Sequence, residues 1–207
     1  MTDPISEPIL ATNNETVCSP LLIDAITRRV KLHHDLYNNL TIKDKYWEYT
    51  LANSFKDINI SCKWDVESHD VGKDIVIESG KYKRISCKSG MISYSKRKKS
   101  ITKLKISSFR TTAYATLEDK LNYIDGNHED VVFSLSSSLF KSQNKYILTV
   151  FIPPVFKQLQ WQQDKNDYKG ISADVTAHIM HKCSDQLWYD IKYDSALILE
   201  KYDICLT

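Results

Sequence analysis

The chain has 207 residues, which is enough for one sizeable hydrophobic core and short for two, so a single domain is expected. Hydrophobic residues make up 42% of the sequence and charged residues 26%, with a net charge of +2, which excludes a disordered or collagen-like chain. The longest apolar runs are too short to cross a bilayer and the N-terminus lacks a signal pattern, so we expect a cytoplasmic protein without a membrane segment.

The cysteines give no sign of a disulfide or zinc site. There are five of them, an odd number, and they are widely scattered and never spaced as C-x-x-C. Reduced thiols in a cytoplasm are therefore expected.

The N-terminal part of the chain predicts an arm followed by two helices. Three prolines within the first 20 residues, few large apolar residues and a polar cluster suggest that residues 1–19 form a flexible arm, and that residues 20–207 form the single domain. Apolar residues recur at helical spacing over 21–40, with Ser19 and Pro20 as the cap and first turn. A second helix is predicted over 43–56 from apolar residues three and four positions apart.

The pattern then changes from helical to extended. Alternating and β-branched segments, a tight turn at 79–81 and a helix signal with Thr116 as N-cap give the remaining elements. The predicted strands are 58–64, 73–78, 82–88, 92–95, 102–107, 131–135 and 146–152, with strand-like pieces at 186–193 and 195–199 and a helix at 116–124. The fold class expected from this order is α/β, with a central mixed β-sheet flanked by helices.

Three residues of the predicted hairpin in GKDIVIESGKYKRISCKSG carry a possible chemistry. Asp74 opens one strand, and side-chain alternation places Ser86 and Lys88 on one face of the next, so the three can converge. Hydrolysis of a phosphodiester needs a hard cation with oxygen ligands, which the Asp74 carboxylate and the carbonyl of Cys87 would supply to Mg²⁺. Lys88 would then position the attacking water or stabilise the charge on the phosphorus.

This segment resembles the catalytic hairpin of type II restriction endonucleases of the PD-(D/E)XK superfamily, whose core has the order helix, three strands, helix, strand. Asp74 and Lys88 stand at the Asp and Lys of the motif, and the resemblance covers about residues 43–135. Ser86 replaces the usual acid, as in a subset of these enzymes that cut CCGG-like sites and carry the acid on the following helix. The resemblance therefore implies Glu118 as the metal-binding acid and Glu48, on the helix before the strands, as a residue that reaches the metal or holds Lys88. Glu78, on the same strand face as Asp74, is the remaining candidate.

A segment without acidic residues points to a polyanionic partner. Eleven Lys and Arg residues and no Asp or Glu lie between Lys81 and Arg110. Such clustering is typical of a surface that contacts phosphates, and a solvated charge run is the alternative. Arg110 would contact a phosphate or a guanine edge, or form a salt bridge beside the next helix. The predicted DNA-binding residues are Lys96, Arg97, Lys98, Lys99, Lys103, Lys105 and Arg110.

Together these observations predict a Mg²⁺-dependent endonuclease that cuts double-stranded DNA at a short specific sequence. A homodimer is expected because palindromic sites mirror a two-fold axis, and no organic cofactor is expected. The unmatched C-terminal third would serve recognition or dimerisation. Two alternatives stay open: a nuclease of the same superfamily that recognises branched DNA, and a catalytically inactive DNA-binding protein, which Ser86 in place of an acid would favour.

Overall fold

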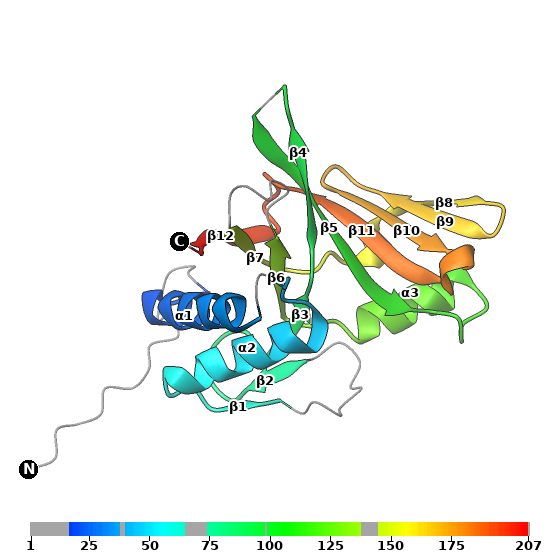
Figure 1. The fold of residues 1–207 in the computed structure, drawn as a ribbon. Helices are drawn as coiled ribbons and strands as arrows, with labels where there is room; N and C mark the ends of the chain where they lie inside the picture. The colour runs from blue at the N-terminus through cyan, green and yellow to red at the C-terminus, as the bar shows by residue number, and fades with distance from the viewer. Residues whose placement is uncertain (1–16, 38–39, 65–73, 98, 138–144, 207) are drawn as a thin grey trace, which may run out of the picture.

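The computed structural model describes residues 17–37, 40–64, 74–97, 99–137 and 145–206. These residues form a mixed α/β structure with two six-stranded sheets and three α-helices (Figure 1). Most of the predicted arm, together with Lys98, lies outside the described residues. Within the described part of the chain, none of the helices combines the length and the apolar character that crossing a membrane requires.

The first sheet is mixed, as predicted. Its strand order is β1-β2-β3-β6-β7-β12, and all neighbours are antiparallel except β3 and β6, which run parallel. The tight turn between β2 and β3 contains Gly80 at φ 97°, a conformation that favours glycine. The bounds are β1 (Cys62–Lys63), β2 (Ile75–Ile77), β3 (Arg84–Lys88), β6 (Val131–Ser137), β7 (Lys145–Phe151) and β12 (Ile198–Cys205).

Two helices, α1 (Pro20–Leu36) and α2 (Asp44–Asp57), cover one face of this sheet. The hydroxyl of Ser19 accepts a hydrogen bond from the Leu22 amide and caps α1, as predicted. In α2 the fully buried Trp47 donates its indole N–H to the Phe133 carbonyl of β6 at 2.9 Å, which fixes the helix against the sheet. Helix α1 ends at Leu36 instead of continuing to residue 40.

The other face of the first sheet is covered by a second, fully antiparallel sheet of order β4-β5-β11-β10-β9-β8, which corrects the expectation of helices flanking a single sheet. Buried residues of both sheets, including Ile147, Phe151, Leu104 and Tyr189, form one core cluster between them. The strands are β4 (Met91–Ser95), β5 (Ser100–Arg110), β8 (Gln160–Asp164), β9 (Asp167–Ile171), β10 (Val175–Met180) and β11 (Gln186–Lys192). Short 3₁₀ helices η2 (Phe156–Gln158) and η3 (His181–Cys183) precede β8 and β11.

The C-terminal third thus builds most of the second sheet and returns one edge strand to the first. The predicted strand over 186–193 corresponds to β11, whereas the piece predicted over 195–199 is confirmed only at its end, because β12 begins at Ile198. The backbone amide of Ser195 donates to Lys192 and that of Ile198 to Ser195, so residues 195–197 form a turn before β12.

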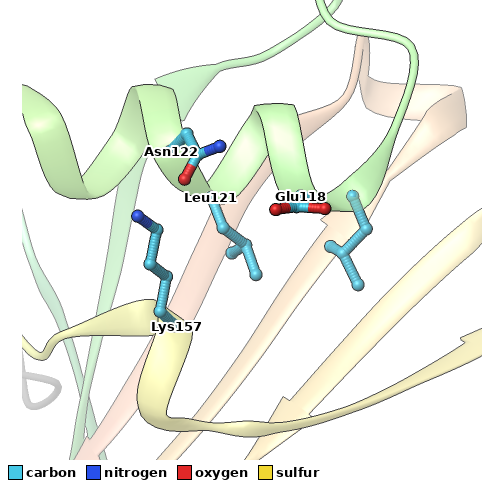
Figure 2. Close-up of a pocket in the computed structure, with 5 residues that line it drawn as sticks. Glu118, Leu121, Asn122 and Lys157 are labelled. Atoms are coloured by element: carbon cyan, nitrogen blue, oxygen red, sulfur yellow. The ribbon is translucent and has the colours of Figure 1, made fainter.

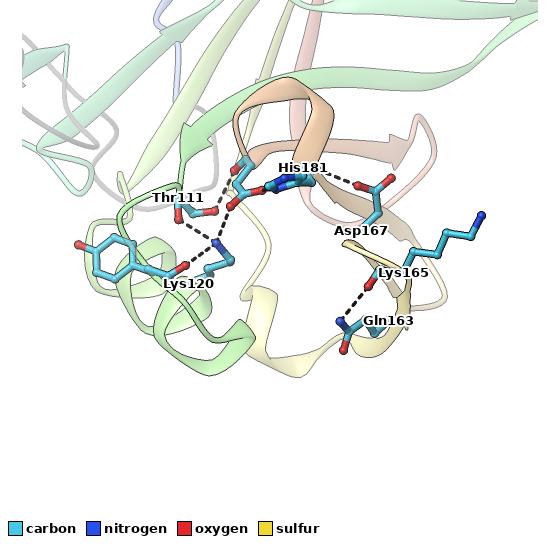
Figure 3. A network of polar contacts seen from close by, with 8 residues as sticks. Thr111, Lys120, Gln163, Lys165, Asp167 and His181 are labelled. Carbon is cyan, nitrogen blue, oxygen red and sulfur yellow. Dashed lines mark hydrogen bonds and ion pairs between the residues drawn. The ribbon is translucent and has the colours of Figure 1, made fainter.

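Helix α3 (Leu117–Gly126) completes the connection that the parallel β3–β6 pair requires. Thr116 caps it by accepting a hydrogen bond from the Asp119 amide at 3.1 Å, as predicted. Lys120 is 3% exposed and donates to the carbonyls of Thr111 and Tyr114 and to the Asp185 carboxylate (Figure 3). This network ties α3 to the start of β11.

The passage from β3 to β4 links the two sheets through a close approach at Gly90. A Cβ atom at this position would lie 2.2 Å from the Ser134 hydroxyl and 2.9 Å from a methyl group of Leu104. Only glycine fits without a shift of these neighbours. Gly90 therefore holds the end of β3, which carries Lys88, against β6.

Candidate active site at the β2–β3 hairpin

The carboxylate of Asp74 is the centre of the candidate site. The Asp74 amide donates to the Ile85 carbonyl at 2.9 Å, so the hairpin register places Asp74 beside Ser86. The Ser86 hydroxyl and the Cys87 amide donate to Asp74 Oδ2 at 2.9 Å and 2.6 Å. The Lys88 ammonium lies 3.7 Å from the same oxygen. The structure thus brings together the four residues of the hairpin that the sequence analysis selected.

Both members of the Asp74–Lys88 pair remain accessible. Their side chains are 21% and 27% exposed, whereas Ser86 is buried. Ser86 faces Asp74 as a hydrogen-bond donor, so it orients this carboxylate and does not add a second negative charge. The hairpin supplies one carboxylate and one ammonium at the boundary with solvent.

Glu48 of α2 joins this site electrostatically. Burial, followed by the negative charge of Asp74, raises the pKa of its carboxyl, while Lys88 and Lys45 act in the opposite direction. The Trp64 indole donates to Glu48 Oε2 at 3.3 Å. The charges of Asp74 and Lys88 thus act on Glu48. A role for Glu48 in reaching a metal or holding Lys88 stays a prediction.

A fourth charged residue of the site, Glu129, was missed in the sequence analysis. It lies just before β6, is 4% exposed, and its Oε2 has no hydrogen-bond partner within the described part of the chain. Burial raises the pKa of the Glu129 carboxyl; the charges of Lys88 and His128 lower it and that of Asp74 raises it further. Glu129 precedes the strand that pairs with β3, and this long-range pairing cannot be read from the local pattern.

The Cys87 thiol points away from this chemistry. It belongs to the core cluster beneath α1 and α2, and burial raises its pKa well above the usual value, so the neutral thiol predominates. The contact of Cys87 with the site is through its backbone amide. A role for its carbonyl as a metal ligand stays a prediction.

The structure does not bring Glu118 or Glu78 together with Asp74. Glu118 is exposed on α3, where it lines a shallow pocket of about 460 Å³ with Leu121, Asn122 and Lys157 (Figure 2). Glu78 is exposed and lies 3.7 Å from the Lys63 ammonium. The inserted strands β4 and β5 belong to the second sheet, and α3, which carries Glu118, packs into the core cluster of that sheet through Leu121 and Ile124.

The basic segment runs through β3 into the β4–β5 hairpin, which projects from the body of the protein (Figure 1). Of its predicted DNA-binding residues, Lys96, Arg97 and Lys99 are exposed at the tip, and Arg110 is exposed at the far end of β5. Lys103 lies 3.9 Å from an Asp190 oxygen, and Lys105 lies 5.2 Å from the centre of a Trp188 ring. The middle of β5 is thus partly engaged with β11, while the tip faces solvent.

The side chains around Asp74 offer oxygen donors, which suit a hard cation such as Mg²⁺. The described residues contain no set of three or more Asp, Glu, His or Cys side chains close enough to hold a metal ion by themselves. Mg²⁺ commonly binds through one or two carboxylates and completes its shell with water and substrate phosphates, so this donor set fits it. Comparison of the chain with models of protein families, with curated proteins and with solved structures gave no match.

Proposed function

We propose that this protein is a Mg²⁺-dependent nuclease that hydrolyses phosphodiester bonds of double-stranded DNA. The observation that carries the proposal is the convergence of Ser86, the Cys87 amide and Lys88 on one oxygen of Asp74. At this accessible edge the carboxylate of Asp74 would bind a metal cation and the ammonium of Lys88 would bind a phosphate, as hydrolysis of a phosphodiester requires.

The arrangement of the elements supports the proposed likeness to the PD-(D/E)XK nucleases. The chain contains, in order, α2, β1, β2, β3, α3 and β6, with the basic β4–β5 hairpin inserted after β3. This follows the order helix, three strands, helix, strand, with Asp74 just before the second strand and Lys88 at the end of the third. Cleavage at a short specific sequence by a homodimer is the finer form of the proposal.

Each polar residue of the site has a role in this proposal. Asp74 would hold Mg²⁺, with Glu48 and Glu129 as the further acids in electrostatic reach. When bound, the ion supplies positive charge that offsets the charge on the phosphate and favours attack by water. Lys88 would place its ammonium on a phosphate oxygen or on the attacking water, and Ser86 would keep Asp74 in the required orientation.

The exposed basic residues of the β4–β5 hairpin support DNA as the substrate. The side chains of Lys96, Arg97 and Lys99 lie at the tip, where they would contact phosphates without reading sequence. The same surface would serve a protein that binds DNA without cutting it, which Ser86 in place of an acid still favours. Cleavage must therefore be measured directly.

The test is incubation of the purified full chain with plasmid DNA and with a branched DNA substrate, in Mg²⁺ or in EDTA. We expect discrete fragments in Mg²⁺, none in EDTA, and none from the Asp74→Asn variant. If the protein cuts only the branched substrate, it is a nuclease that recognises the structure of the DNA and not its sequence. Binding in EDTA without cutting in Mg²⁺ would overturn the nuclease proposal and leave a DNA-binding protein.

A further inference from the structure

An aromatic groove of about 730 Å³ lies between α1 and α2. Rings line it on both sides: His33 and Tyr37 lie 4.7 Å apart, and Tyr49 and Trp64 lie 5.5 Å apart, measured between ring centres. Tyr46, between these pairs, is 63% exposed, and Tyr49 is 51% exposed. Exposed rings grouped in a cavity of this size are typical of a ligand site.

The groove is continuous with the candidate active site through Trp64. This residue lines the groove, and its indole N–H donates to the Glu48 carboxylate. Lys45 also lines the groove, and its charge acts on Glu48. Trp64 thus contacts both the groove and the acid on which the charges of Asp74 and Lys88 act, so a strand that leaves the proposed cleavage site past Glu48 would enter the groove.

The lining favours an anionic ligand with flat rings. Its charged side chains are Arg29 and Lys45, and no Asp or Glu is among its described residues. Arg29 forms a bidentate ion pair with Asp57, which holds its guanidinium in place and offsets part of its charge. Aromatic faces beside cations bind nucleobases by stacking and the sugar-phosphate chain by charge, and they do so with single strands because paired bases are stacked on each other.

We infer that this groove binds one or more unpaired nucleotides of the nucleic acid whose phosphodiester lies at Asp74. The inference rests on the proposed function and narrows its substrate: the preferred DNA would carry a single-stranded extension, flap or unpaired base next to the cut. The exposed Leu32 and Leu36 at the groove would also suit a second copy of the chain, which is the rival occupant.

The experiment measures fluorescence anisotropy of labelled DNA with the full chain in EDTA, so that no cutting occurs. A blunt duplex is compared with the same duplex carrying a single-stranded extension. We expect the extension to improve affinity about tenfold, which is the scale of one base stacked on an aromatic ring. The Tyr46→Ala/Tyr49→Ala double variant should lose this preference and keep its affinity for blunt duplex.

Matched variants separate stacking from a general disturbance. Tyr46→Phe/Tyr49→Phe keeps the rings and should keep the preference, and Tyr94→Ala, an exposed tyrosine on β4, should also keep it. A wild-type chain without the preference, or a double alanine variant that retains it, overturns the inference. If the alanine variant instead turns a dimer into a monomer in sedimentation velocity with the preference unchanged, the groove is an interface between copies.

These outcomes are separable from those of the proposed function. A chain that cuts plasmid DNA but shows no preference for the extension contradicts the groove inference alone. A chain that prefers the extension but does not cut in Mg²⁺ contradicts the nuclease alone.

Discussion

Two lysine–aspartate pairs in this protein differ in a way that separates structure from function. Between α3 and the start of β11, the Lys120 ammonium lies 2.8 Å from an Asp185 oxygen, with side chains 4% and 15% exposed. It also donates to the carbonyls of Thr111 and Tyr114, so all three of its protons have acceptors. Such a pair holds α3 against β11, and a ligand could reach it only if the surrounding contacts broke.

The pair of Lys88 and Asp74 is looser and more accessible. The distance is 3.7 Å, the side chains are 27% and 21% exposed, and two further acids, Glu48 and Glu129, lie in electrostatic reach. The single ammonium of Lys88 offsets only part of the negative charge of the three acids around it. A bound cation would offset the rest, and a bound phosphate would give Lys88 a further partner. The first pair thus stabilises the fold, and we propose that the second binds a ligand.

The largest expected effect is the loss of stability when the lysine of each pair is replaced, which should be large for Lys120 and small for Lys88. Lys120→Met should lower the free energy of unfolding by about 3–5 kcal/mol, because it leaves Asp185 and two carbonyls without their buried partner. Lys88→Met should change it by about 1 kcal/mol or less, because its pair is partly exposed. Urea denaturation of both variants and the wild type at pH 7 measures this, and equal losses would contradict the distinction.

The next effect concerns Glu129, whose burial raises the pKa of its carboxyl. The folded state then binds the Glu129 proton more tightly than the unfolded state, so stability falls as pH rises from the unfolded pKa through the folded one. Glu129→Gln should therefore stabilise the chain by on the order of 1 kcal/mol at pH 7 and have little effect at pH 3. Denaturation of both proteins at the two pH values tests the sign, and a variant less stable at pH 7 would contradict it.

The β2–β3 hairpin could be predicted from the sequence because the residues that define it lie close together in the chain. Asp74, the turn at Gly80 and the alternation through Ser86 and Lys88 fix which side chains face each other once two strands pair. The caps at Ser19 and Thr116 were likewise predicted from single residues and are confirmed.

Long-range pairing accounts for what the sequence did not reveal. Glu129 reaches the site because β6 pairs in parallel with β3, 46 positions away at Ile85↔Val131. Glu118 was selected because its helix follows the strand of Lys88 in the chain, but the inserted β4–β5 hairpin joins the second sheet and α3 packs with it. The second sheet itself was missed because strand patterns do not indicate which sheet a strand will join.

The smallest expected effect is on the salt dependence of DNA binding, and it compares the basic residues at the β4–β5 tip with Lys103 in the middle of β5. A triple variant with Gln at Lys96, Arg97 and Lys99 should weaken binding to all DNA sequences alike and lower the slope of log affinity against log salt by up to about three units, roughly one for each lost phosphate contact. Lys103→Gln should change the slope less, because its ammonium is already near Asp190. Binding titrations at several salt concentrations provide the slopes. An unchanged slope in the triple variant would leave the tip as a solvated charge run.

Single-turnover cleavage of plasmid DNA in saturating Mg²⁺ tests the central claim most directly. Lys88→Met should reduce the rate by on the order of 10²–10³-fold while the variant stays folded and binds DNA in EDTA as the wild type does, because Lys88 is assigned to charge stabilisation at the phosphate. Glu118→Gln is the matched control on α3 and should cut at the wild-type rate. A Lys88→Met variant with nearly wild-type cleavage would contradict the assignment of the Asp74–Lys88 pair as the active site.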